Sequence, residues 1–182
     1  FCIWPSEMTT HDTQTAGYTG DVLAELSAAC TKYDIDMGLY LSPWDVNSEY
    51  YGYKDKDGKK LIGADGQPLN GKTWEQVKAE DVLDYNEYYD KQLREILGNE
   101  KYGNKGRFTE VWMDGAKDTN DKSNAQDYDF QKWYKTIQEF EGKASGKYDD
   151  DCLLFGAQAY TTVRWIGNER GYAAEETWAK ST

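Results

Sequence analysis

The chain has 182 residues, of which 33 are acidic and 21 basic, so its formal net charge at pH 7 is −12. A surface this negative repels phosphate backbones and anionic bilayers, which argues against nucleic acid or a membrane surface as a partner. No stretch approaches the roughly 20 consecutive apolar residues of a membrane span. Seven Trp and fifteen Tyr are many for so polar a chain. Most should pack in the core, but aromatic rings exposed in clefts also stack on sugars.

Strand-like and helix-like segments alternate along the chain. In chain order we expect a strand at 1–4, a helix at 20–34, a strand at 35–45, a helix at 82–100, a strand at 108–115, a helix at 128–142 and strands at 152–158 and 162–169. Asp21 is placed to cap the first helix. Strands and helices alternating at this spacing predict a parallel sheet with helical crossovers.

Polar side chains gather at the carboxyl ends of the predicted strands. The runs MGLYL, FTEVWM and CLLFG are continuous rather than alternating, as expected of strands buried on both faces. Ser42, Trp44 and Asp45 follow the first run, Asp114 the second and Gln158 the third. In a (β/α)₈ barrel this face carries the active site. We therefore predict an α/β fold of the TIM-barrel type, in which Asp114 is either a catalytic carboxylate or the first residue of an Asp-Gly turn.

A long polar segment at about 50–75 interrupts the alternation. Two Asp-Gly turn signals, at 57–58 and 65–66, flank the apolar pair Leu61 and Ile62. We interpret this segment as a hairpin-like insertion above the active face. The chain offers about five strand-helix units, whereas a complete barrel takes about 250 residues. We therefore expect residues 1–182 to be part of one catalytic barrel domain, and FCIW to be the middle of a strand rather than a leader peptide.

Neither the cysteines nor the histidine predict a metal site. Cys2, Cys30 and Cys152 form no CxxC pair and sit among apolar or small residues, so they are most simply buried hydrophobes. His11 lies in a polar loop. The acids of the insertion are similar to a calcium loop, but Gly58 comes too early and the acid that ends such a loop is missing. We expect neither a metal nor a cofactor.

Six ordered segments resemble glycoside hydrolase family 29, the retaining α-L-fucosidases: FCIWPS, GDVLAELSAACTKY, GLYLSPWD, YNEYYDKQLREIL, EVWMDGA and VRWIGNERGYAAEETW. The resemblance is closest to the subfamily that prefers α-1,3 and α-1,4 linked fucose on branched, Lewis-type glycans. It implies Asp114 as the nucleophile, Glu169 as the general acid/base, and Trp112 and Arg164 as residues of the fucose pocket. We count among the further substrate-binding residues Tyr40, Trp44, Asp45 and Trp178.

The chemistry of retaining hydrolysis requires such a pair of carboxyl groups. One attacks the anomeric carbon, and the second, roughly 5 to 5.5 Å away, protonates the leaving oxygen and later activates water. As the acid, Glu169 needs a raised pKa; a neighbour such as Trp165 could raise it by desolvation, whereas Arg164 would lower it. Glu175 and Glu176 are rivals for this role.

Two other interpretations stay open. A non-catalytic glycan-binding protein on a hydrolase scaffold could use its tryptophans for stacking, and the isolated chain could be an inactive fragment. The presence of both Asp114 and Glu169 favours the enzyme, because a lectin need not retain them. The expected partner is a fucosylated oligosaccharide or glycoconjugate, and the expected location is secreted or at the surface of a bacterium.

Overall fold

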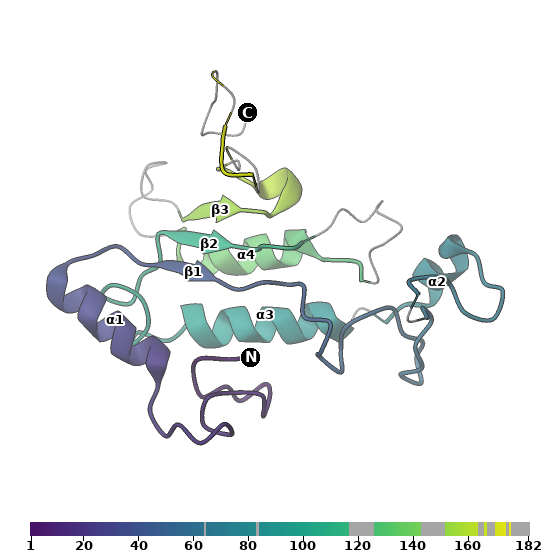
Figure 1. Ribbon diagram of the computed structural model, residues 1–182, viewed down its shortest axis with the longest axis horizontal. Coiled ribbons are helices and arrows are strands. Elements are labelled where there is room, and N and C mark those ends of the chain that lie inside the picture. The colour runs from purple at the N-terminus through teal and green to yellow at the C-terminus, as the bar shows by residue number, and fades with distance from the viewer. Residues whose placement is uncertain are drawn as a thin grey trace.

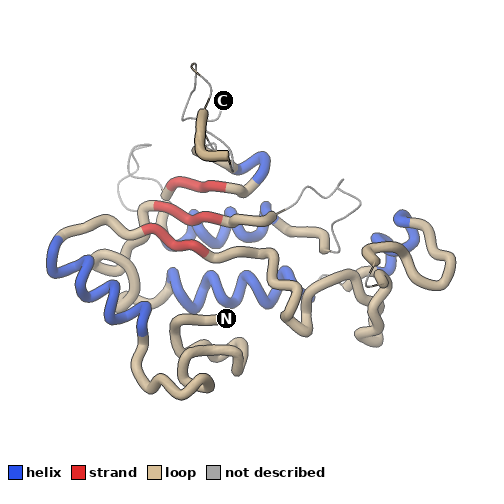
Figure 2. Tube along the Cα trace, in the orientation of Figure 1, coloured by secondary structure: helices blue, strands red, loops and turns tan. Residues whose placement is uncertain are grey.

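The computed structural model describes residues 1–63, 65–82, 84–116, 126–142, 152–163, 166, 170–173 and 175, and these form an α/β structure (Figures 1 and 2). Its helices are α1 (Val22–Tyr33), α2 (Trp74–Glu80), α3 (Asp84–Leu97), α4 (Phe130–Phe140) and the 3₁₀ helix η2 (Gln158–Tyr160). Its strands are β1 (Gly38–Tyr40), β2 (Glu110–Trp112) and β3 (Leu153–Phe155).

The three strands form a parallel sheet in the order β1-β2-β3. Leu39, Val111 and Leu154 stand in register at its centre, are buried and belong to one apolar core with residues of α3 and α4. Residues on either side of them in each strand point to the opposite face. That face is open, since Tyr40 is exposed and Trp112 and Phe155 are only half-buried. Helices α3 and α4 cover the other face (Figure 1).

The three long predicted helices are confirmed, and each lies inside its predicted range. Asp21 caps α1 by accepting a hydrogen bond from the Ala24 N–H at 3.0 Å, and Asp129 caps α4 in the same way. Helix α2 was not predicted, although a capping box marks its start: Thr73 and Gln76 bond reciprocally to each other's backbone N–H groups.

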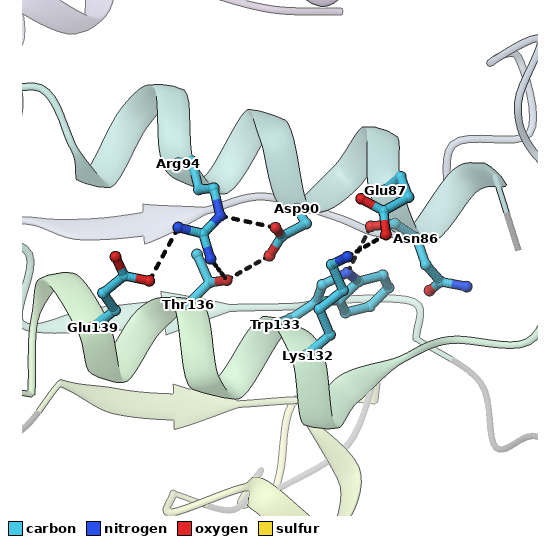
Figure 3. Close-up of polar contacts among 8 residues, drawn as sticks. All are labelled: Asn86, Glu87, Asp90, Arg94, Lys132, Trp133, Thr136 and Glu139. Carbon is cyan, nitrogen blue, oxygen red and sulfur yellow. Dashed lines mark hydrogen bonds and ion pairs between the residues drawn. The ribbon is translucent and has the colours of Figure 1, made fainter.

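A polar network joins α3 to α4 beneath the sheet (Figure 3). Asp90 is buried and accepts hydrogen bonds from the Thr136 hydroxyl and from Nε of Arg94, the latter at 2.9 Å. Arg94 also reaches Glu139 at 3.0 Å, and the indole of Trp133 donates to a main-chain carbonyl of α3 at 3.1 Å. These contacts fix how the two helices pack against each other.

Residues 52–82 form an arm that projects from the sheet on the side of the strands' carboxyl ends (Figure 1). The predicted insertion contains two tight antiparallel turns, with bridges from Lys54 to Lys60 and from Ile62 to Pro68, followed by α2. Gly58 and Gly66 adopt φ values of 75° and 74°, which favour glycine. The arm has a small apolar core of its own, formed by Tyr53, Leu61, Ile62 and Val77.

Two predicted strands differ from the structure. Residues 1–4 form no strand: Cys2 makes a single bridge with Asp12, and no strand of the described ranges pairs with this segment to extend the bridge into a ladder. The second is the segment 162–169, of which only Thr162, Val163 and Ile166 are described. The N–H groups of Thr162 and Val163 both donate to the Leu154 carbonyl. Within the described ranges, no helix has the length and apolar character needed to cross a bilayer.

Candidate active site

Asp114 lies two residues beyond the central strand, at its carboxyl end. The preceding residue, Met113, is buried, and its N–H donates to the Phe155 carbonyl at 2.8 Å. The Ser42 hydroxyl donates to the main-chain carbonyl of Asp114 itself at 2.7 Å. The backbone is therefore held from both neighbouring strands, and Asp114 is more than the first residue of a free turn.

The Asp114 carboxylate is oriented by the last residue of β1. The hydroxyl of Tyr40 donates to Oδ2 of Asp114 at 2.6 Å. This hydrogen bond to a carboxylate is the main cause that raises the pKa of Tyr40 above its ordinary value of 10.0. The phenol therefore stays protonated at neutral pH and remains a donor.

Three aromatic rings line the open face of the sheet beside Asp114. Tyr40, Trp112 and Phe155 are in register as the last residues of their strands. The ring centroids of Tyr40 and Trp112 are 5.4 Å apart and those of Trp112 and Phe155 4.7 Å, both in edge-to-face geometry. Because strand residues alternate, Trp112 and Asp114 point to the same face. Such a row of rings offers an apolar surface to one side of a sugar.

Trp44 packs against the turn that follows Asp114. Gly115 has a φ of 74°, a backbone conformation that favours glycine. A Cβ at this position would also lie only 3.0 Å from Cβ and Cε3 of Trp44, so a side chain would crowd the tryptophan. The Trp44 N–H donates to the Ser42 hydroxyl at 3.2 Å. The residue is 52% exposed, which leaves aromatic surface for a ligand.

A hollow of about 930 Å³ extends from Tyr40 past Trp44 and Asp45. The segments 1–11 and 40–50 form its walls, together with residues of α3. Its acidic lining residues are Glu7, Asp45 and Glu49, and no lysine or arginine of the described residues lines it. A neutral ligand that donates hydrogen bonds, such as a sugar, suits this lining.

The structure thus brings together Tyr40, Trp44, Asp45, Trp112 and Asp114 from separate segments. The predicted acid/base Glu169 and the predicted binding residues Arg164 and Trp178 lie outside the described residues. Sequence reasoning assigned no role to Ser42, which links Trp44 to Asp114; its only signal was its place directly after a strand. Among the residues that the structure describes, no cluster of three or more His, Cys, Asp or Glu side chains is arranged to hold a metal ion.

The known proteins to which this chain is similar are α-L-fucosidases. The family model described as alpha-L-fucosidase matches residues 1–164. Alpha-L-fucosidase 1 of Arabidopsis thaliana is 35% identical over 98% of this chain and 27% of its own length. These matches place the chain among the glycoside hydrolases. It belongs to the α-L-fucosidase family.

Solved structures show the same relationship. The structure of a GH29 fucosidase of Ruminococcus gnavus in complex with fucose is 56% identical, with a TM-score of 0.76 over 98% of this chain and 33% of that one. AlfC of Lactobacillus casei in complex with its α-L-fucose product is 17% identical, with a TM-score of 0.58 over 96% of this chain and 49% of that one, and shows the fold alone. The chain spans about a quarter to a third of the length of the Arabidopsis and Ruminococcus relatives.

Proposed function

We propose that the full-length protein is a retaining exo-glycosidase that releases L-fucose from branched glycans, in a (β/α)₈ barrel to which β1, β2 and β3 contribute. The observation that carries this proposal is the placement of Asp114 at the carboxyl end of the central strand, with its carboxylate held by Tyr40 and its main-chain carbonyl by Ser42. A carboxylate fixed beside an aromatic row is suited to attack an anomeric carbon. The fucose bound in the Ruminococcus gnavus relative supports the choice of sugar.

In the proposed reaction, Asp114 attacks the anomeric carbon of fucose and the bond to the leaving oxygen breaks. Glu169 gives its proton to that oxygen, and a fucosyl ester forms on Asp114. Glu169 then takes a proton from water, which attacks the same carbon and releases fucose with its original configuration. Tyr40 keeps one Asp114 oxygen hydrogen-bonded, so that the carboxylate is already oriented before substrate arrives.

We further propose a preference for α-1,3 and α-1,4 linkages of Lewis-type glycans. The hollow beyond Tyr40 supports this, because it offers room and an exposed tryptophan where the sugar that carries the fucose would lie. Trp44 would stack on this sugar, and Asp45 would accept hydrogen bonds from its hydroxyl groups.

The test is to measure fucose release by Asp114→Ala in the full-length protein, with an aryl α-L-fucoside as substrate. Loss of at least about 10³-fold in turnover is expected, since the covalent step is removed. Glu169→Ala should impair natural glycosides more than aryl substrates with good leaving groups, and azide should rescue it. Unchanged turnover in Asp114→Ala would refute the nucleophile, and failure of both Glu169 tests would transfer the acid role to Glu175 or Glu176.

A further inference from the structure

Tyr50 lies in the hollow described above, and the proposed cleavage of fucose does not use it. Its ring stacks on that of Tyr88 in α3, with centroids 5.1 Å apart and planes inclined by 28°. Tyr50 is 38% exposed, so part of it remains accessible. Nζ of Lys54 lies 6.0 Å from the centre of the Tyr50 ring. Tyr50 is therefore fixed by Tyr88 and has a cationic group over its ring.

Lys54 is unusual for a lysine in an acidic chain. Only 8% of the residue is exposed, yet within the part of the chain that the structure describes it forms no ion pair. Lysines are rarely this buried unless they are paired. Five lysines elsewhere in the structure do pair with carboxylates, namely Lys72, Lys78, Lys101, Lys105 and Lys132.

Lys54 opens a seven-residue segment, 54–60, that we call the lysine turn. It holds four lysines and two aspartates in a chain whose net charge is −12. Its other lysines are Lys56, Lys59 and Lys60; all three are exposed and, like Lys54, none forms an ion pair with a described residue. The carboxylate of Asp55 accepts the N–H groups of Asp57 and Lys59, so its hydrogen bonds lie within the turn.

The position of the lysine turn links it to the active site. The bridge between Lys54 and Lys60 closes the turn at the base of the arm. The arm projects on the side of the strands' carboxyl ends, where Asp114 lies (Figure 1). The hollow has Tyr40, which bonds to Asp114, at one end, and it also includes Tyr50, whose ring centre lies 6.0 Å from Nζ of Lys54.

We propose that Tyr50 and the lysine turn bind a sulfated sugar on the same glycan from which fucose is cleaved, an inference that rests on the proposed function. The sugar ring would contact the exposed part of Tyr50, and the sulfate ester would accept hydrogen bonds from the ammonium groups. Asp45 and Glu49 line the hollow itself, so neutral sugars fill it and the sulfate lies beyond them. At ordinary salt concentrations, charges more than about 8 to 10 Å apart are largely screened from each other. The negative charge of the rest of the molecule therefore does not prevent the lysine turn from attracting a nearby sulfate.

The experiment compares two fucosylated oligosaccharides that differ only in a sulfate ester on a sugar distant from fucose. We expect the full-length protein to have a roughly three- to tenfold higher kcat/KM for the sulfated substrate at low salt, and this ratio to fall toward one as salt rises. In the triple variant Lys56→Gln, Lys59→Gln, Lys60→Gln the ratio should be close to one at every salt concentration. Turnover of an aryl fucoside should not change, because these exposed side chains do not line the hollow that begins at Tyr40.

A matched control carries the same charge change on other exposed lysines: Lys32→Gln, Lys91→Gln and Lys135→Gln. It should keep the preference for the sulfated substrate. Equal kcat/KM values for the two substrates in the wild type would overturn the inference and leave the proposed function intact, whereas no fucose release from any substrate would overturn the proposed function. Single-stranded DNA that competes as strongly as a sulfated polysaccharide of equal charge would also overturn the inference, since the turn would then recognise charge alone.

Discussion

Two hydroxyl groups hold Asp114 at different atoms. The Tyr40 phenol donates to the carboxylate, and the Ser42 hydroxyl donates to the main-chain carbonyl. Since both donors come from β1 and the residues that follow it, the geometry of the proposed nucleophile depends on the pairing of β1 with β2. The same serine accepts the Trp44 N–H, so one residue positions both the reacting group and the neighbouring ring.

Tyr40→Phe tests the phenol alone, because the ring and its contact with Trp112 are retained. A hydrogen bond to a charged group is worth about 1.5–3 kcal/mol, so kcat/KM for an aryl α-L-fucoside should fall roughly 10- to 100-fold. Steady-state kinetics measure this. Tyr18→Phe is the matched control, since the Tyr18 hydroxyl also donates to a carboxylate, that of Glu25, but on the exposed surface at 2.8 Å. A loss equal in both variants would contradict a special role for Tyr40.

Trp44→Ala tests whether Trp44 contacts the sugar that carries the fucose or the fucose itself. Removal of the ring should weaken transition-state stabilisation for both substrates. The loss should be about 1–3 kcal/mol larger with a Lewis-type oligosaccharide than with an aryl fucoside, roughly the value of one aromatic contact. The ratio of the two kcat/KM values measures this difference, and Trp44→Phe should restore part of it. Equal losses on both substrates would show that Trp44 supports the turn at Gly115 instead.

At the scale of the elements, α1 depends on Asp21. Its carboxylate accepts hydrogen bonds from the Ala24 N–H and, at 2.9 Å, from the Tyr102 hydroxyl, and it pairs with Lys101 at 2.9 Å. Partial burial by itself favours the neutral acid, but these donors outweigh it and hold the pKa of Asp21 below its ordinary value of 3.8. The cap thus joins the start of α1 to the loop that precedes β2.

Asp21→Ala should lower the free energy of unfolding by about 1–2 kcal/mol at pH 7, and Asp21→Asn, which can still cap, by less. Because the folded-state pKa is lowered, the charged Asp21 stabilises the fold fully above about pH 4, and this contribution is lost as the pH falls through the folded pKa. Urea unfolding of wild type and Asp21→Asn, measured from pH 7 to pH 3, should therefore show a difference that shrinks with acid. A difference that grows below pH 4 would contradict this.

At the scale of the whole molecule, the arm at 52–82 has a core of its own, and it contacts the segment before α4 through the Lys78–Asp127 ion pair and the Gly52 N–H, which donates to Gln126. Its apolar core is separate from the main one, and the Val82 N–H donates to the Lys54 carbonyl at 3.0 Å, so the chain enters and leaves the arm at one point. The sheet and its helices, in contrast, share a single core. Segments with close ends and few outside contacts tolerate replacement.

Replacement of residues 55–80 by a short glycine linker should therefore change aryl fucoside turnover by less than about twofold and leave the thermal unfolding midpoint within a few degrees. Turnover of large branched glycans should fall, because the surface that the arm adds beyond the hollow is lost. Calorimetry and kinetics on both substrates check this. A collapse of stability would show that the arm supports the main core.

The sequence by itself determined the parts of this protein that depend on neighbours along the chain. Capping residues and the helical spacing of apolar residues located α1, α3 and α4, and continuous apolar runs located the three strands. The position of Asp114 directly after such a run marked it as a candidate catalytic residue. Helices bond within themselves, and buried strands need apolar side chains, so both leave local signals. Only α2, which follows the predicted insertion, was missed among the α-helices of the described residues.

The tertiary structure alone decided which groups meet. Tyr40 and Asp114 are 74 positions apart, and no spacing in the sequence announces the hydrogen bond between them. Residues 1–4 look like a strand, yet they form none, because a strand exists only where another supplies its hydrogen-bonding partners. Tyr50 and Lys54 have no family motif to mark them, and their proposed role depends on the stacking of Tyr50 on Tyr88, on the hollow that Tyr50 lines and on the nearness of Lys54 to the Tyr50 ring. Side-chain contacts at a site arise from strand pairing and helix packing, which join residues far apart in sequence and therefore leave no local pattern.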